Sequence, residues 1–175
     1  MTDVAPNVEA PSAANVPEAP KVRKRSNVKN LAFVLVTAGI IPFFICSLGI
    51  ATHVVESVML LKVLVVYSAV VIGHFSGVFT ATALFQDYDH PTLSRWLIVY
   101  SLFLVVAAAG LLFVTHTNAQ LIGFIGLFLL MWLLDLLLVI KRIYPLWFFG
   151  LRTLATVLIM GLLVLTKLTL IHHLY

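Results

Sequence analysis

The chain has 175 residues, of which 62% are hydrophobic and only 10% are charged, and its formal net charge is +4. Its mean hydropathy of +1.10 excludes an ordinary soluble domain, because no domain of this size buries so much apolar surface in its own core. The positive charge requires no nucleic-acid partner, since most basic residues flank one side of the apolar stretches. The sequence therefore predicts an integral membrane protein whose first partner is the lipid bilayer.

The N-terminal segment differs in composition from the rest of the chain. Residues 1–20 are mainly Ala, Pro, Val and Asn, which build neither a helix nor a core, and a basic cluster suited to anionic lipid follows at 21–29. We predict a disordered cytoplasmic tail over 1–30. Mitochondrial transit peptides avoid acids, and this tail contains Asp3, Glu9 and Glu18. The bacterial cytoplasmic (inner) membrane is therefore favoured over the mitochondrial inner membrane.

Five apolar stretches fill residues 31–175, each near or above the roughly 20 residues that a helix needs to cross a bilayer. We expect an all-α polytopic membrane protein, a bundle of five transmembrane helices. The expected spans are about 31–50, 60–84, 96–114, 119–140 and 151–171.

Basic residues indicate the orientation of this bundle, because cytoplasmic connections retain an excess of Lys and Arg. With the N-terminus inside, only Lys62 and Lys167 fall on the outer side. We therefore predict a cytoplasmic N-terminus and an outer C-terminus. The inner side receives Lys21, Arg23, Lys24, Arg25, Lys29, Arg95, Lys141, Arg142 and Arg152.

The first span contains a proline. Pro42 removes one backbone hydrogen bond, frees the carbonyl of Ala38 and should kink the helix. The lone Cys46 excludes an intrachain disulfide, and we interpret it as a small apolar side chain.

The second span carries a stripe of small residues at spacings of three and four, which lets a neighbouring helix approach closely. Such a stripe more often stabilises the packing of helices in a bundle than lines a transport pathway. His74 lies off the stripe, on the face of Tyr67. It is interpreted as a neutral imidazole bonded to Tyr67 or to a carbonyl of another helix, or alternatively as a proton relay or cofactor ligand. The stripe consists of Ala69, Gly73, Ser76, Gly77 and Thr80.

Asp135 is the most costly residue to place in the membrane, at roughly 2.5 to 3.5 kcal/mol near the bilayer centre. A hairpin between the last two spans would bring it within reach of Arg152. One interpretation is that Asp135 pairs with Arg152, or accepts hydrogen bonds from Thr153 or Thr156, and locks the bundle. The other is an ion or proton site that also uses His74.

Aromatic residues dominate the segment 143–150, which we expect to lie along the headgroup boundary before the fifth helix. On the outer side, the expected topology gathers four histidines with Glu56 nearby. No HxH, HxxxH or CxxC spacing fixes a pair of ligands, so interfacial histidines are favoured over a copper or zinc site. The weak metal candidates are His53, His116, His172 and His173.

Short motifs occur along the chain: Pro42-Phe43, Tyr67-Ser68-Ala69-Val70, Ser76-Gly77, Pro91 with Trp96, Asp135, Trp147, Leu151-Arg152 and Thr156. In these motifs the sequence resembles an uncharacterised family of small bacterial inner-membrane proteins that includes mitochondrial transmembrane protein sixty-nine. The resemblance covers about 31–167 and implies five helices in the inner membrane without adding any chemistry. Ser76 stands where the family usually has the first of two glycines, and Phe79 and Thr80 stand where a basic or histidine residue and a tryptophan usually follow.

No nucleophile elbow, glycine-rich phosphate loop, paired-carboxylate motif or metalloprotease helix occurs in the sequence. We therefore expect no enzyme and no cofactor. The favoured function is that of a non-enzymatic accessory or assembly subunit whose partners are other membrane subunits or a second copy of the chain. The alternative is a small ion or proton transporter that uses Asp135, His74 and Arg152, although an odd number of helices does not divide into inverted repeats.

Overall fold

The computed structural model describes residues 28–52, 57–86 and 91–172, and this part of the chain is all-helical. Its five helices are all long and apolar enough to cross a membrane, which confirms the expected fold class. They are α1 (Val28–Thr52), α2 (Ser57–Gln86), α3 (Pro91–Leu112), α4 (Thr117–Ile140) and α5 (Leu146–His172). The predicted tail up to residue 27 lies outside the described residues.

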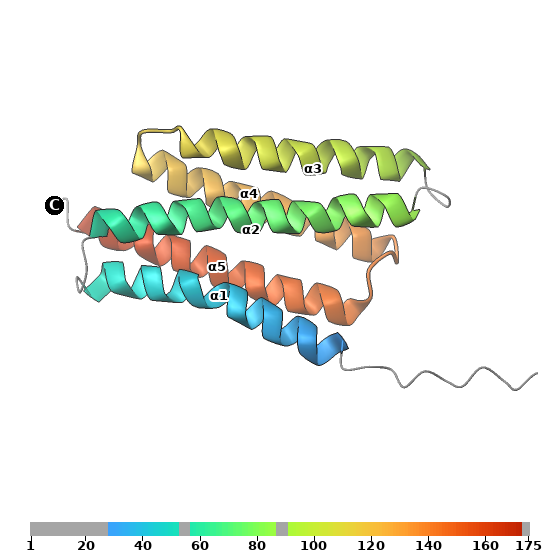
Figure 1. Cartoon of the computed structure of the whole chain (residues 1–175), viewed down its shortest axis with the longest axis horizontal. Coiled ribbons are helices and arrows are strands. Elements are labelled where there is room, and N and C mark those ends of the chain that lie inside the picture. The colour runs from blue at the N-terminus through green and yellow to red at the C-terminus, as the bar shows by residue number, and fades with distance from the viewer. Residues whose placement is uncertain (1–27, 53–56, 87–90, 173–175) are drawn as a thin grey trace, which may run out of the picture.

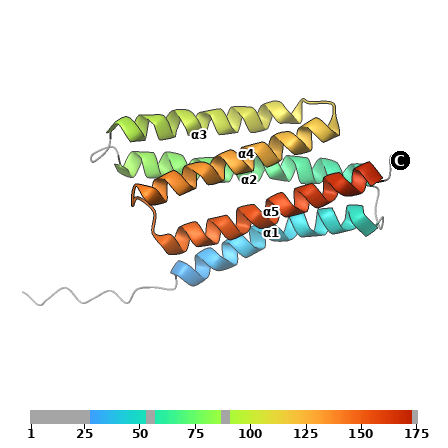
Figure 2. The ribbon, with the colours of Figure 1, turned by 180° about the vertical axis from the view of Figure 1, so that it is seen from behind.

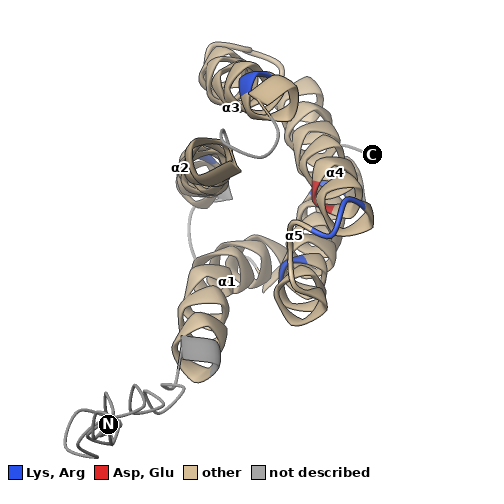
Figure 3. Cartoon of the chain, turned by 90° about the vertical axis from the view of Figure 1, so that its right-hand side faces the viewer, with Lys and Arg blue, Asp and Glu red and all other residues tan. Residues whose placement is uncertain are grey.

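Successive helices run in opposite directions and form one elongated bundle (Figures 1 and 2). Each helix packs against the next, and α1 also packs against α5, so the helices form a closed ring in the end view of Figure 3. The backbones of α2 and α5 do not meet within the described residues. Side chains bridge part of the space between them, where Arg152 of α5 contacts Phe75 and Phe79 of α2.

The outer surface of the ring is apolar. Phe85, Phe113 and Leu146 are 86%, 85% and 76% exposed, and many other large hydrophobic side chains also point outward. Water would make such a surface aggregate, whereas lipid tails solvate it. Lipid is therefore the solvent to which this bundle is matched.

All five helices begin earlier than the sequence indicated, and α3 and α5 do so by the widest margin. Proline suits the first turn of a helix, where its missing N–H is not needed, and α3 begins at Pro91 rather than near residue 96. Pro145 precedes α5, and its carbonyl accepts hydrogen bonds from the N–H groups of Phe148 at 3.0 Å and Phe149 at 3.2 Å. Trp147, Phe148 and Phe149 thus lie in the first turn of α5 rather than before the helix. Their place at the headgroup boundary stays a prediction.

Helix α1 continues through Pro42 and bends partway along its length (Figure 1). Phe43 follows the proline, is fully buried and packs edge-on against the Tyr67 ring, with 5.1 Å between the centroids. The Tyr67 hydroxyl donates a hydrogen bond of 3.0 Å to the carbonyl of Gly39. These contacts with α2 hold the bent half of α1 in the bundle.

Candidate functional site

The α4–α5 connection positions the only ion pair found within the described residues. At the end of α4, the backbone N–H of Lys141 donates a hydrogen bond to Leu137 O at 3.0 Å, and that of Arg142 donates to Val139 O at 2.8 Å. Arg142 then adopts a φ of 59°, in the left-handed region, which reverses the chain within a few residues. The short reversal places Asp135 of α4 opposite Arg152 of α5.

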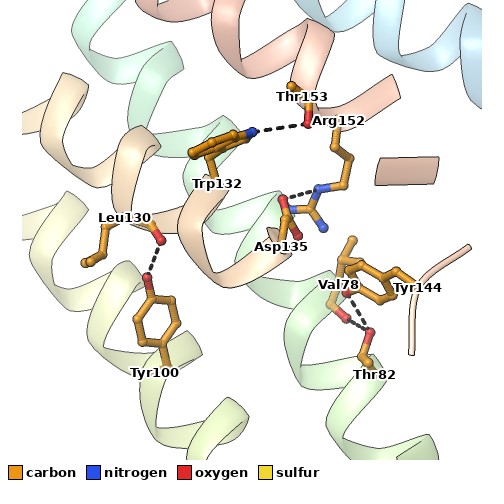
Figure 4. A network of polar contacts seen from close by, with 9 residues as sticks. All are labelled: Val78, Thr82, Tyr100, Leu130, Trp132, Asp135, Tyr144, Arg152 and Thr153. Carbon is orange, nitrogen blue, oxygen red and sulfur yellow. Dashed lines mark hydrogen bonds and ion pairs between the residues drawn. The ribbon is translucent and has the colours of Figure 1, made fainter. Parts of the chain in front are cut away.

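Asp135 and Arg152 form a buried ion pair at the centre of Figure 4. The Arg152 Nε lies 3.0 Å from Asp135 Oδ2, and each residue is 1% exposed. The two groups are close but are not aligned as a hydrogen bond. Burying two charges costs several kcal/mol per ion in desolvation, so their mutual attraction alone offsets that cost only in part.

Aromatic rings surround the guanidinium of Arg152 and supply a second source of stabilisation. Its Cζ lies 4.6 Å from the ring centroid of Phe75 and 4.8 Å from that of Phe79, both on α2. The ring of Phe148, one turn earlier on α5, lies 5.7 Å away. The negative faces of aromatic rings attract a cation, by about 2 kcal/mol or more when water is excluded. Arg152 therefore joins α5 to α2, although their backbones do not meet.

Hydrogen bonds on either side of the pair fix the surrounding helices. The Trp132 indole Nε1 donates to Thr153 Oγ1 at 3.1 Å and links α4 to α5. The Tyr100 hydroxyl donates to the carbonyl of Leu130 at 2.8 Å and links α3 to α4. Figure 4 shows both bonds beside the ion pair. These two bonds join α3, α4 and α5 on either side of the pair.

Tyr144, in the α4–α5 connection, closes one side of the site. The Thr82 hydroxyl donates its single proton to Val78 O at 2.8 Å, so at 2.9 Å it accepts the proton of Tyr144. The Tyr144 oxygen consequently keeps its lone pairs as hydrogen-bond acceptors. Burial raises the pKa of Tyr144, while the Arg152 charge acts in the opposite direction.

Several polar atoms of the ion pair have no hydrogen-bond partner among the described residues. These atoms are Asp135 Oδ1 and Oδ2 and Arg152 Nε, Nη1 and Nη2, of which Oδ2 and Nε face each other as the ion pair. An unsatisfied buried donor or acceptor costs about 1 to 3 kcal/mol, and more when it is charged. The site is therefore enclosed by the protein but incompletely satisfied by it.

The other residues predicted for this site do not join the pair. Thr156 is 1% exposed, yet the structure gives it no hydrogen bond to Asp135. His74 is exposed on the wall of a pocket of about 360 Å³ between α1, α2 and α5, together with Tyr67 and Gly39. It forms no ion pair with Asp135, and Tyr67 donates to Gly39 instead of to His74. The structure thus brings together Asp135 and Arg152 but not His74.

The small-residue stripe of α2 divides into two parts. Ser76 and Thr80 face α3, where Ser76 Oγ donates to Ser101 O at 2.6 Å and Ser101 Oγ donates to Ser76 O at 2.9 Å. Thr80 Oγ1 lies 2.6 Å from Ser101 Oγ. By contrast, a Cβ added at Gly73 or Gly77 would meet no atom within 4 Å. Within the chain, the close helix contact is therefore made by hydroxyl groups rather than by the two glycines.

Sequence reasoning missed the aromatic neighbours of Arg152 and the α3 partners of the stripe. In a span that is apolar on every side, Phe75 and Phe79 carry no sign of the face they occupy. The α3 residues did carry a signal, because Ser94, Ser101 and Ala108 recur every seven residues on its buried face.

The predicted metal candidates do not form a cluster that the structure describes. His53 and His173 lie outside the described residues, as does the side chain of His172. His116 precedes α4 and caps it through its backbone rather than its side chain. Across residues 28–52, 57–86 and 91–172, no three His, Cys, Asp or Glu side chains come together.

The fold and this site define a polytopic α-helical membrane protein with a buried intramembrane ion pair. The chain belongs to the family described as protein of unknown function (DUF3429), whose model matches residues 28–168. The match extends from the first described residue of α1 almost to the end of α5 and includes Asp135 and Arg152. No curated protein and no solved structure matches the chain.

Proposed function

We propose that this protein is a non-enzymatic accessory or assembly subunit of a complex in the bacterial inner membrane. The observation that carries the proposal is the enclosure of its most polar site. Asp135 and Arg152 are each 1% exposed, and aromatic rings cover the guanidinium. A reactive or ion-conducting group must meet its substrate, whereas a structural pair need only hold helices together. The geometry thus favours a role as a rigid membrane component.

The charge distribution supports a particular orientation in that membrane. Arg95, Lys141 and Arg142 lie at the end of the bundle where α1, α3 and α5 begin, and this end is viewed in Figure 3. In the opposite half of the bundle, the basic residues whose side chains the structure describes are Lys62 and Lys167. The excess of basic residues supports a cytoplasmic N-terminus and an outer C-terminus.

Photo-crosslinking in native membranes tests the subunit role. A photoreactive residue is placed at one lipid-facing position on each helix, with the chain expressed at its native level. We expect crosslinks to the same partner protein at adjacent positions and none on the opposite face of the bundle. Lipid adducts alone at every position would contradict the proposal. The positions are Leu35, Val70, Val99, Leu129 and Leu158, which are 63%, 59%, 59%, 46% and 45% exposed.

A second candidate function is ion or proton transport through the same pair. The unpartnered Asp135 Oδ1 and the two Arg152 Nη atoms favour it, because conducting sites keep polar groups available. It requires access from one side of the membrane, and the pocket beside His74 does not include Asp135 or Arg152 in its wall. Reconstituted vesicles separate the two functions. A proton or ion flux that Asp135→Asn abolishes supports transport. If vesicles that contain the protein show the same flux as empty vesicles, the structural role is supported.

A further inference from the structure

Two unsatisfied atoms of the ion pair, one from each residue, point to the same side of it. In Figure 4 the second carboxylate oxygen of Asp135 and one terminal nitrogen of Arg152 point to the same side of the pair, toward Val78 and Tyr144. Asp135 Oδ1 is an acceptor without a donor, and Arg152 Nη1 and Nη2 are donors without an acceptor. The two deficits are complementary, so a single small ligand able both to donate and to accept would satisfy both.

Water has this chemistry. A buried water molecule typically makes about three hydrogen bonds to polar groups that would otherwise be unsatisfied. Around this pair it finds a carboxylate acceptor, guanidinium donors and the Tyr144 oxygen, which is an acceptor because its proton goes to Thr82. An added anion would face the Asp135 carboxylate, and an added cation would face Arg152. A neutral ligand avoids both repulsions.

We propose that the Asp135–Arg152 pair is hydrated inside the bundle, by a bound water molecule that accepts a hydrogen bond from Arg152 Nη and donates one to Asp135 Oδ1. The inference goes beyond the proposed subunit role, since it concerns the content of the bundle rather than its partners. It also explains how two charges are retained in an apolar ring, because water-mediated bonds are nearly as favourable in enthalpy as direct ones.

Hydroxyl-radical footprinting tests this directly, because radicals formed from bound water modify adjacent side chains even where bulk solvent does not reach. Phe79 is the probe, since it is 0% exposed and lies 4.8 Å from Arg152 Cζ. Phe124 and Phe128 are matched controls, because both are also 0% exposed but neither ring lies over Arg152 within the contacts described. The measurement uses the full-length protein in lipid nanodiscs, irradiated and analysed by mass spectrometry.

We expect modification of Phe79 and none of Phe124 or Phe128. An unmodified Phe79 would show that the pair is dry, and equal modification of all three rings would show general solvent leakage; either result overturns the proposal. Replacing chloride by sulfate in the buffer should leave the modification unchanged. If Phe79 is modified only without chloride, the site holds an anion instead, which also overturns it.

The double variant Asp135→Leu/Arg152→Met provides the second arm of the test. It removes the polar anchors together and so avoids leaving one charge unpaired. Loss of Phe79 modification in the folded variant supports water held by the pair. Persistent modification at the wild-type level would show that the water is held elsewhere and would overturn the proposal. If the variant does not fold, the comparison of Phe79 with Phe124 and Phe128 in the wild-type protein decides alone.

Discussion

The interface between α2 and α3 is joined by hydroxyl groups, whereas the interface between α4 and α5 contains two full charges. Ser76 and Ser101 each donate to the other's carbonyl, so every donor between them has an acceptor. Asp135 and Arg152 approach to 3.0 Å but leave polar atoms unpartnered. Both interfaces are buried in the same apolar ring, and they differ mainly in the electrical charge of their polar groups.

This difference determines what each interface loses when one partner is removed. Neutral hydroxyl bonds between membrane helices contribute about 0.6 kcal/mol on average, because alternative partners exist in the unfolded state as well. Removing one member of a buried ion pair leaves the other as an uncompensated charge, which costs about 3 to 5 kcal/mol. The charged interface should therefore be much more sensitive to single substitutions than the hydroxyl interface.

The largest effect is expected for Arg152→Met. This substitution leaves the Asp135 carboxylate buried and removes the cation that contacts Phe75 and Phe79. The free energy of unfolding should fall by about 3 to 5 kcal/mol. Steric trapping in bicelles measures this quantity in a lipid environment. A loss comparable to that of an average hydroxyl bond would remove the contrast between the interfaces.

An intermediate effect is expected for Ser101→Leu, which inserts a larger side chain into the buried contact between α2 and α3. Ser101 is 5% exposed and its hydroxyl contacts both Ser76 and Thr80. Overpacking of this kind costs about 1 to 3 kcal/mol. The same unfolding measurement applies, with Leu102→Ala as the control, because Leu102 is 64% exposed to lipid. Equal losses for both variants would show that this interface is not closely packed.

A smaller effect is expected for Trp132→Phe. The variant keeps an aromatic ring but loses the 3.1 Å hydrogen bond to Thr153 Oγ1. The loss should be about 0.6 kcal/mol. Thr153→Val removes the same bond from the other side and serves as the matched variant. If the double variant loses the sum of both single losses, the two side chains do not interact.

The smallest effect is a pH dependence confined to alkaline conditions. Burial holds the pKa of Tyr144 above the value of about 10 that it has in the unfolded chain. The folded state therefore binds this proton more tightly, and its contribution is complete below pH 10 and lost as pH rises through the folded pKa. The difference in stability between wild type and Tyr144→Phe should be constant from pH 7 to 9 and shrink above about 10. A constant difference up to pH 11 would contradict this assignment.

The sequence was sufficient for the helix count because each span exceeds the length needed to cross a bilayer. It also singled out Asp135 and Arg152, since charged residues are conspicuous in apolar stretches. It could not identify Phe79 as a neighbour of Arg152, because hydrophobicity in these spans shows no periodicity from which a buried face could be read. The start of α5 was misplaced for a similar reason. Aromatic residues such as Phe148 and Phe149 are as typical of a membrane interface as of a helical turn.

The central claim is that Asp135 and Arg152 act together as a structural lock between α4 and α5. The most direct test is a double-mutant cycle that compares the free energies of unfolding of Asp135→Leu, Arg152→Met and the two combined. We predict that the combined variant is more stable than either single variant, because no charge remains buried alone. Additive losses, with the combined variant the least stable of the three, would contradict the account.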